Sequence, residues 1–283
     1  MNKIENIGVV GSGTMGNGIA HVFSLSKFKV TLVDLDKSIL DQAISIISKN
    51  MERQVKKGLI SEGDKQDGIN NISVNTDISA LSDSDLVIEA VSENYDIKSK
   101  IFTNLDSVCR PDSILASNTS SISISKIADV TNRPDKVIGM HFMNPVPVMK
   151  LIEVINGNKT SKETLDSILD ISKKLNKIPL ECNDSPGFVS NRILMPLINE
   201  AAHCLMDNVA KEESIDGIMK LGMGHPMGPL MLADLIGIDV CVSIMKVLED
   251  GLNDIKYAPC PLLLDMVKDQ KLGKKTGEGF YKY

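Results

Sequence analysis

The sequence of 283 residues has no apolar run near the ~18 to 20 residues that a transmembrane helix needs, so a membrane-spanning protein is not expected. The chain also lacks an excess of positive charge, because 37 Asp and Glu outnumber 31 Lys and Arg and leave a net charge of -6. Binding to a phosphate backbone needs a broad positive surface, so nucleic acid is not expected as the main partner. Internal repeats and low-complexity tracts are absent as well. These features predict a globular protein, long enough for about two domains of roughly 100 to 200 residues each.

Cysteine is scarce and scattered along the chain. There are five cysteines, an odd number, and none stands in a CxxC pair, which argues against a disulfide framework and against a zinc site. We therefore expect no metal and a reducing compartment, the cytoplasm. A targeting segment is not expected either, because the first apolar run begins at Ile4 and already has the pattern of a strand.

Short apolar runs alternate with helical patterns through the first part of the chain. This alternation is typical of an α/β fold in which a mostly parallel sheet is wound with helices. Strands are expected at residues 4–10, 29–33, 72–74, 86–89, 114–116, 137–140, 151–155 and 178–180. Helices are expected at residues 15–26, 39–55, 97–108, 122–128 and 161–175. We predict a Rossmann-type, doubly wound first domain.

The pattern changes at NDSPGF, residues 183–188, where the strands cease and Pro186 can open a helix. We expect a domain boundary here, with residues 1–184 in the Rossmann-type domain and 185–283 in a smaller all-helical domain. The next helix is apolar on nearly every side and is therefore expected to be buried all round. A small domain can hardly bury such a helix alone, so we predict a homodimer in which this domain packs against its copy.

Three glycines follow the first expected strand in the segment GVVGSGTMGNGIA. Gly11, Gly13 and Gly16 have the GxGxxG spacing, which permits a tight turn and a close approach of a pyrophosphate. The helix that begins there supplies amide donors and positive potential at its N-terminus. The strand, turn and helix together predict a dinucleotide site.

Asp34 is the first polar residue after the second expected strand and stands 23 positions after Gly11, close to the expected ~20. Its carboxylate can accept hydrogen bonds from both hydroxyls of the adenosine ribose and would repel a 2′-phosphate, which favours NAD over NADP. In the alternative reading, the glycines make only a tight turn and Asp34 caps the next helix. Asp36 is the better candidate for that cap.

Basic residues gather at the C-terminal end of the long helix expected at residues 39–55. Arg53, Lys56 and Lys57 suit the negative end of the helix dipole there. The same three positive charges suit an anion equally well, so both interpretations stay open.

His141 differs from the other three histidines by its place in the pattern. His21 and His203 lie on expected helices and His225 in a turn-rich loop, where packing roles are the default. His141 stands at the C-terminal end of an expected strand, the edge of an α/β sheet where ligands bind. A histidine, with an ordinary pKa near 6.5, is the usual base for the proton that remains when hydride leaves a carbinol.

Glu153 stands within the next apolar run, after a chain reversal at NPVP, residues 144–147. The prolines prevent a helix, so the following strand can return Glu153 toward His141. A carboxylate in an apolar strand is costly unless it is paired. We expect Glu153 to orient the imidazole and to stabilise its charged form, as the third member of a catalytic triad does. The alternative is a solvent-facing Glu153 on an edge strand.

The chain resembles the L-3-hydroxyacyl-CoA dehydrogenases, most closely the short bacterial 3-hydroxybutyryl-CoA dehydrogenases. The resemblance covers nearly the whole length and rests on motifs in the family's order: GSGTMGNGIA, VIEAVSEN, ASNTSSISI, GMHFMNPVPVMKLIEVI, SPGFVSNRIL, GHPMGPLMLADLIGID and GKKTGEGFYKY. It implies reversible NAD-dependent oxidation of a (3S)-3-hydroxyacyl-CoA to the 3-oxoacyl-CoA. A short substrate, 3-hydroxybutyryl-CoA with acetoacetyl-CoA as its product, is expected.

The resemblance also assigns roles to individual residues. His141 and Glu153 match the catalytic dyad, while Ser120 and Asn191 match the polar residues at the substrate oxygen. The cofactor site would include Gly11, Gly13, Gly16 and Asp34, together with Thr14, Met15, Glu93, Lys98 and Asn118. The substrate site would include Ser120, Asn191 and Asn144. Apart from the resemblance, the basic patch at the end of the long helix leads us to expect Lys56 and Lys57 near the CoA phosphates.

Small departures from the family pattern occur at Met143, Ser190 and Met231. They leave the reaction class untouched and make the preferred acyl-chain length uncertain, since one or two methylenes change discrimination by only ~1 to 3 kcal/mol. Two rival interpretations stay open. One is a dehydrogenase of free 3-hydroxy acids, whose usual catalytic lysine has no matching motif here, and the other is an NAD-binding protein without catalysis.

Overall fold

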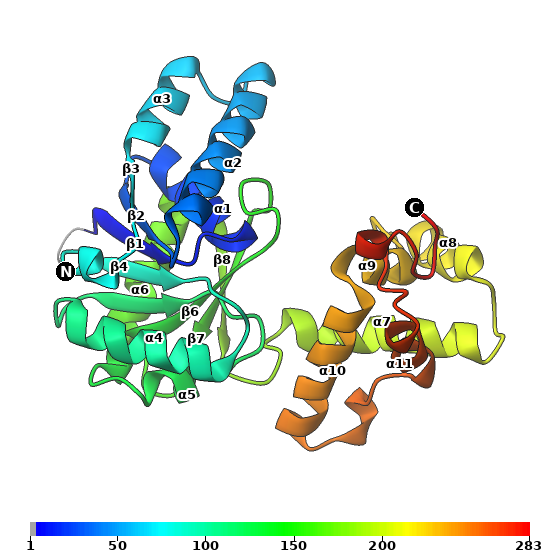
Figure 1. The fold of residues 1–283 in the computed structure, drawn as a ribbon. Coiled ribbons are helices and arrows are strands. Elements are labelled where there is room, and N and C mark those ends of the chain that lie inside the picture. Colours follow the sequence, from blue (N-terminus) through cyan, green and yellow to red (C-terminus); the bar gives the residue numbers. More distant parts are fainter. Residues whose placement is uncertain (1–3) are drawn as a thin grey trace. The chain divides into compact units, whose positions relative to one another are not determined.

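The computed structural model describes residues 4–283, and the chain divides into two compact units. The first unit ends at Asp184 and the second runs from Ser185 to Tyr283 (Figure 1). The first contains a sheet wound with helices and the second is helical, as the predicted fold class requires. In the part of the chain that is described, no helix is both long enough and apolar enough to cross a membrane.

All eight predicted strands are present in one sheet. Its strand order is β3-β2-β1-β4-β5-β6-β7-β8, and neighbouring strands are parallel except for the antiparallel pair β6 and β7. The strands are β1 (Asn6–Val10), β2 (Lys29–Val33), β3 (Ile72–Asn75), β4 (Leu86–Glu89), β5 (Ile114–Ser117), β6 (Val137–Phe142), β7 (Leu151–Asn156) and β8 (Ile178–Asn183). The strand order reverses between the parallel neighbours β1 and β4, and this is the switch point at which such sheets bind their ligands.

The helices of the first unit include the five that the periodicity predicts. They are α1 (Thr14–Leu25), α2 (Lys37–Lys56), α4 (Tyr95–Val108), α5 (Ile124–Ala128) and α6 (Lys162–Lys174), with short 3₁₀ turns η1 (Ile78–Leu81) and η2 (Pro134–Lys136). A further helix, α3 (Glu62–Asn70), was not predicted, because it is polar nearly throughout and Gly68 alone is fully buried. A capping box starts it: Ser61 Oγ accepts from the Asp64 amide, while Asp64 Oδ2 accepts from the Ser61 amide.

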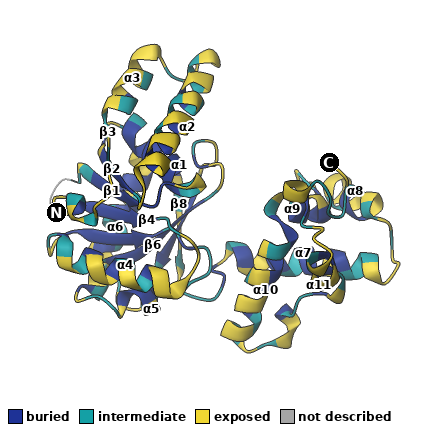
Figure 2. Cartoon of the chain, viewed as in Figure 1, coloured by how far each residue is buried: buried dark blue, intermediate teal, exposed yellow. Residues whose placement is uncertain are grey.

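The core of the first unit lies on both faces of the sheet. Strands β4, β5 and β6 are buried along their whole length, which is why they read as continuous apolar runs (Figure 2). At the edge of the sheet, β8 is largely exposed. The apolar layer beneath α1 and α2 includes Phe23, Leu40, Ile47 and Met51. This packing fixes the strand ends that carry the polar residues described below.

The second unit consists of α7 (Ser190–Met206), α8 (Glu212–Gly222), α9 (Pro229–Ile236), α10 (Ile238–Leu252) and α11 (Pro261–Lys268), with 3₁₀ turns η3 (Ile255–Tyr257) and η4 (Lys274–Thr276). The first helix does not begin at Pro186 as predicted. Gly187 and Phe188 have φ values of 70° and 51°, which a right-handed helix cannot contain, so Pro186 lies in a turn.

Within the single chain this helix is not buried all round, and its predicted complete burial depends on the predicted dimer. One face of α7 packs into the core of the second unit through Met195, Ile198 and Ala202. On another face Ile193 is 67% exposed, and Met206 at the C-terminal end is partly exposed. Helix α7 therefore exposes apolar side chains that the rest of the second unit does not cover.

Candidate active site

The glycine-rich turn joins β1 to α1 with the geometry that a dinucleotide needs. Gly11 has a φ of 92°, a conformation that glycine adopts without strain. A side chain at Gly16 would collide with the carbonyl oxygen of Gly11, so the turn and the helix can approach each other only because Gly16 has no Cβ. Helix α1 begins directly after Gly13, with Thr14 and Met15 in its first turn. The amides of this turn form a site for an anionic group.

Asp34 is bonded to the same turn from the end of β2. Its Oδ2 accepts from both the amide and the hydroxyl of Ser12, each at 2.7 Å, and its Oδ1 accepts from the amide of Leu35 at 2.7 Å. Asp36, not Asp34, caps α2, because its side chain accepts from the Ser38 amide at 2.6 Å. The predicted division of roles between these two acids is therefore confirmed for the cap.

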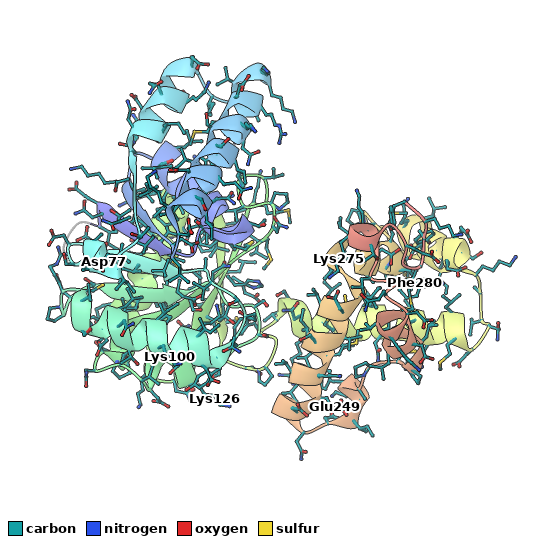
Figure 3. The ribbon with its side chains drawn as sticks, viewed as in Figure 1. Asp77, Lys100, Lys126, Glu249, Lys275 and Phe280 are labelled. Atoms are coloured by element: carbon teal, nitrogen blue, oxygen red, sulfur yellow. The ribbon has the colours of Figure 1, made fainter. Side chains whose placement is uncertain are left out.

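A pocket of about 740 Å³ opens beside Asp34. It lies at the carboxyl ends of β1, β2 and β4, and Gly11 and Gly13 line it together with Asp34. Asp77, which precedes η1, and Lys100 of α4 line it as well, and Figure 3 labels both side chains. A mostly apolar pocket with a few placed polar groups, at the switch point of such a sheet, is typical of an adenosine site.

Three charged side chains meet at the end of β4. Nζ of Lys98 lies 2.6 Å from Glu89 Oε1 and 3.4 Å from Glu93 Oε2, with Lys98 1% exposed and Glu89 fully buried. Ser117 Oγ donates to the other oxygen of Glu89 at 2.7 Å. Burial alone would raise the pKa of Glu93, but the Lys98 charge and several hydrogen bonds hold that pKa below its ordinary value. Glu93 is therefore stabilised as a carboxylate.

Glu93 organises the loop that follows β5. Its Oε1 accepts from Thr119 Oγ1 at 2.5 Å, from the Ser120 amide at 2.9 Å and from the Ser121 amide and hydroxyl at 3.0 Å each. The Ser120 hydroxyl lies 3.3 Å from the same oxygen. Two predicted site residues, Glu93 and Ser120, are thus brought into direct contact. In the same loop Asn118 Oδ1 accepts from the Phe142 amide, which joins the ends of β5 and β6.

His141 and Glu153 are paired across β6 and β7. They are direct partners in the antiparallel register, and His141 Nδ1 lies 3.0 Å from Glu153 Oε2. Their side chains are 11% and 6% exposed. The predicted contact is present, and the alternative of a solvent-facing Glu153 on an edge strand is wrong, because β8 pairs with the outer side of β7. A carboxylate on one ring nitrogen favours the tautomer that carries its proton there.

The other predicted residues lie away from this pair or in the second unit. Asn144 is exposed in the turn after β6. Lys56 and Lys57 lie at the C-terminal end of α2, roughly 30 Å along the helix from its start near Asp34, and Lys56 pairs with Glu52 at 2.8 Å. Asn191 is buried in the first turn of α7, in the second unit. The roles assigned to these residues stay predictions.

Family models match almost the whole chain. Residues 6–185 match the model of the 3-hydroxyacyl-CoA dehydrogenase NAD binding domain, and residues 187–283 match that of the 3-hydroxyacyl-CoA dehydrogenase C-terminal domain. The chain belongs to the 3-hydroxyacyl-CoA dehydrogenase family. The resemblance drawn from the sequence motifs is thereby confirmed. This 3-hydroxyacyl-CoA dehydrogenase is an oxidoreductase, and its cofactor is NAD.

Relatives support the assignment over most of their length. A probable 3-hydroxybutyryl-CoA dehydrogenase of Bacillus subtilis is 51% identical over 281 residues, which cover 99% of this chain and 98% of the relative. Human mitochondrial hydroxyacyl-coenzyme A dehydrogenase is 41% identical over 99% of this chain and 91% of its own. The crystal structure of (S)-3-hydroxybutyryl-CoA dehydrogenase from Ralstonia eutropha is similar, with a TM-score of 0.97, 46% identity and 99% of both chains covered.

Sequence reasoning missed several residues that support the candidate site. Glu89, Ser117 and Thr119 support the Glu93 cluster, and Ser12 holds Asp34. Only Glu89 carried a usable signal. It is a carboxylate at the end of an apolar strand, the same pattern that singled out Glu153.

Proposed function

We propose that this 3-hydroxyacyl-CoA dehydrogenase interconverts (3S)-3-hydroxybutyryl-CoA and acetoacetyl-CoA, with His141 as general base and general acid and Glu153 as its orienting carboxylate. The buried contact between His141 Nδ1 and Glu153 Oε2 is the observation that carries this mechanism. The short-chain substrate is supported by relatives named as 3-hydroxybutyryl-CoA dehydrogenases, at 51% identity in Bacillus subtilis and 49% in Clostridioides difficile.

The chemistry at His141 follows from its hydrogen bond. With the Nδ1 proton directed to Glu153, the neutral ring has its basic lone pair on Nε2. During oxidation Nε2 accepts the proton of the substrate hydroxyl, and Glu153 stabilises the resulting imidazolium. NAD would supply the acceptor for the hydride that leaves the carbon bearing this hydroxyl. In the reverse direction His141 donates the proton to the oxygen, which Ser120 and Asn191 hold in place.

The cofactor residues divide along the edge of the sheet. The amides around Gly11, Gly13, Thr14, Met15 and Gly16 bind the pyrophosphate, and Asp34 accepts from the adenosine ribose. Glu93 and Asn118 lie in the loops after β4 and β5, Lys98 lies in the first turn of α4, and together they hold the nicotinamide end on the side toward Ser120. The fit rests on the turn that lacks room for a Cβ and on the anchored Asp34 carboxylate.

The CoA ester has a second set of proposed contacts. Asn144 approaches the acyl part from the turn after His141. Lys56 and Lys57 are exposed at the end of α2 and can meet the CoA phosphates as a local positive patch on an acidic protein. A CoA thioester would make the contacts with Lys56 and Lys57, whereas a free 3-hydroxy acid has no CoA phosphates to make them.

The assembly and its compartment complete the proposal. The enzyme is a homodimer that associates through the second unit, where Ile193, Val209, Ile218 and Leu221 expose apolar surface. It acts in the cytoplasm, which is supported by five cysteines of which none forms a disulfide in the described chain. Sedimentation at micromolar concentration tests the dimer, and a monomer there would contradict it.

One assay tests the proposed reaction. NADH oxidation is followed with acetoacetyl-CoA, NADPH replaces NADH in a second series, and free acetoacetate replaces the thioester in a third. We expect rapid turnover only with NADH and the CoA ester, since Asp34 repels a 2′-phosphate. Turnover of free acetoacetate at an equal rate would favour a dehydrogenase of free 3-hydroxy acids. Binding of NADH without any turnover would favour a noncatalytic protein.

A further inference from the structure

Lys177 is a buried lysine whose ammonium contacts backbone oxygens. It lies between α6 and β8 and is 8% exposed. Its Nζ donates to the carbonyl oxygens of Val146 and Met149, each at 2.5 Å. Burial lowers the pKa of Lys177, because the charged form is partly removed from water. A buried ammonium is costly, and an apolar side chain of similar length would fill the same space without that cost.

Both carbonyls belong to the turn between β6 and β7, residues 143–150. This turn begins just after His141 and ends just before β7, which carries Glu153. Within it, the amides of Val148 and Met149 donate to the Pro145 carbonyl. The turn contains no strand or helix of its own, and the two contacts from the Lys177 side chain add to its backbone hydrogen bonds at the Pro145 and Lys150 carbonyls.

The opposite side of the turn packs against the cofactor helix. Val146 is buried against α1, where a Cβ at Gly18 would lie only 2.8 Å from the Cβ of Val146. The turn is therefore held between Gly18 of α1 on one side and the Lys177 ammonium on the other. Asn144, a proposed substrate contact, stands in the same turn next to Pro145.

We propose that Lys177 is a positioning residue for the reaction, which holds the turn between His141 and Glu153 so that Asn144 meets the substrate in a fixed geometry. The proposal rests on the proposed function of the site. Lys177 itself does not touch the reacting atoms. A displacement of about 1 Å in such a supporting segment can cost about 100-fold in rate. The need to fix this turn therefore accounts for the buried Lys177 ammonium, although its burial costs folding free energy.

Replacement by methionine is the first test, because Met keeps the length of the side chain and removes the ammonium. We expect Lys177→Met to lower kcat with acetoacetyl-CoA about 10- to 100-fold while the Kd for NADH stays within about twofold. Lys174→Met, an exposed lysine in the last turn of α6, is the matched control and should leave both values unchanged. A folded Lys177→Met with wild-type kcat would overturn the proposal.

A loss of stability must be separated from a loss of positioning. Ile168→Ala removes buried packing from α6, keeps the Lys177 ammonium and serves as a destabilised control. Assayed well below its melting temperature, it should keep its kcat, whereas Lys177→Met should not. An equal loss of kcat in both variants would reduce Lys177 to a structural role and overturn the proposal.

Chemical rescue provides the decisive readout, and it is available even if Met is poorly tolerated. Lys177→Ala lacks the carbons and the nitrogen that n-propylammonium carries. We expect n-propylammonium to restore kcat at least about fivefold, whereas tetramethylammonium, which has no N–H group, should restore nothing. Equal effects of the two cations, or none from either while the wild-type enzyme is active, would contradict the proposal. An inactive wild-type enzyme would instead contradict the proposed function itself.

Discussion

His141 and Glu153 stand directly opposite each other on antiparallel strands, with His141 Nδ1 3.0 Å from Glu153 Oε2. The strands β6 and β7 are the only antiparallel neighbours in the described sheet. A direct antiparallel pair brings two Cβ atoms within about 4.5 to 5.5 Å on one face of the sheet. The backbone register therefore creates the pair, and burial of both side chains makes the hydrogen bond persistent.

Replacement of His141 by alanine removes the proposed acid and base. We expect kcat to fall by about 10² to 10⁴, the usual contribution of general acid-base catalysis, because Ser120 and the cofactor site remain in place. The Kd for NADH, measured by fluorescence titration, should stay near the wild-type value. Wild-type turnover in this variant would show that another group handles the proton.

Replacement of Glu153 by glutamine keeps the size of the side chain and removes its charge. We expect kcat to fall about 10²-fold or more, because the amide no longer stabilises the imidazolium and can reverse the tautomer of His141. Stopped-flow assays should find the loss in the chemical step and not in NADH binding. A stable variant with full activity would make Glu153 a structural residue.

Neutralising the two lysines at the end of α2 tests the anchoring of CoA. In Lys56→Gln/Lys57→Gln we expect a higher KM for acetoacetyl-CoA with little change in kcat. The rise should be larger at low salt, where exposed charges are less screened. The same double change at Lys173 and Lys174, in the last turn of α6, is the control for net charge and helix position. Equal KM values in both double variants would remove these lysines from the substrate site.

Lys98 holds two carboxylates at the centre of the site, so its loss should affect folding. Lys98→Met leaves Glu89 buried without a positive partner, and breaking a buried pair in this way costs about 3 to 5 kcal/mol. Lys100→Met, two residues further along α4 and exposed, should change the free energy of unfolding by less than about 0.5 kcal/mol. Urea unfolding of both variants measures the difference. Comparable stabilities would show that the Lys98–Glu89 pair contributes little to the free energy of unfolding.

His21 should make the enzyme less stable in mild acid. Burial lowers the pKa of His21 from 6.5, a hydrogen bond with Gln54 raises it, and the Lys177 charge lowers it further. The net shift is downward, so the unfolded chain binds more protons below about pH 6.5, and the free energy of unfolding falls as pH drops through that value.

The variant His21→Gln isolates this effect. Its side chain is not protonated in this range, so its urea midpoint should change less between about pH 7.5 and 5.5 than that of the wild type. Both proteins are compared in the same buffers. Parallel pH profiles would show that His21 is not responsible for the loss of stability.

Local patterns account for most of the fold that was predicted. The strands β4, β5 and β6 were recognisable because a strand covered on both faces reads as an unbroken apolar run. Helix α3 was not predicted because periodicity detects an apolar face. This helix has a polar surface, and its N-terminus is stabilised by a capping box. The start of α7 was misplaced because Pro186 is compatible with a helix, whereas the positive φ angles of Gly187 and Phe188 are not.

The sequence by itself determined the residues that belong to one stretch of chain: the glycine turn, the acid after β2, and the alternation that makes an α/β fold. It also predicted the contact of His141 with Glu153, since only a short turn separates their strands. Only the tertiary structure revealed the cluster of Glu89, Lys98, Ser117 and Glu93, and the contact of Lys177 with the turn after His141. These groups are distant in sequence and meet because parallel strands end at the same edge of the sheet, or because a buried charge must find partners wherever the fold leaves unpaired oxygens.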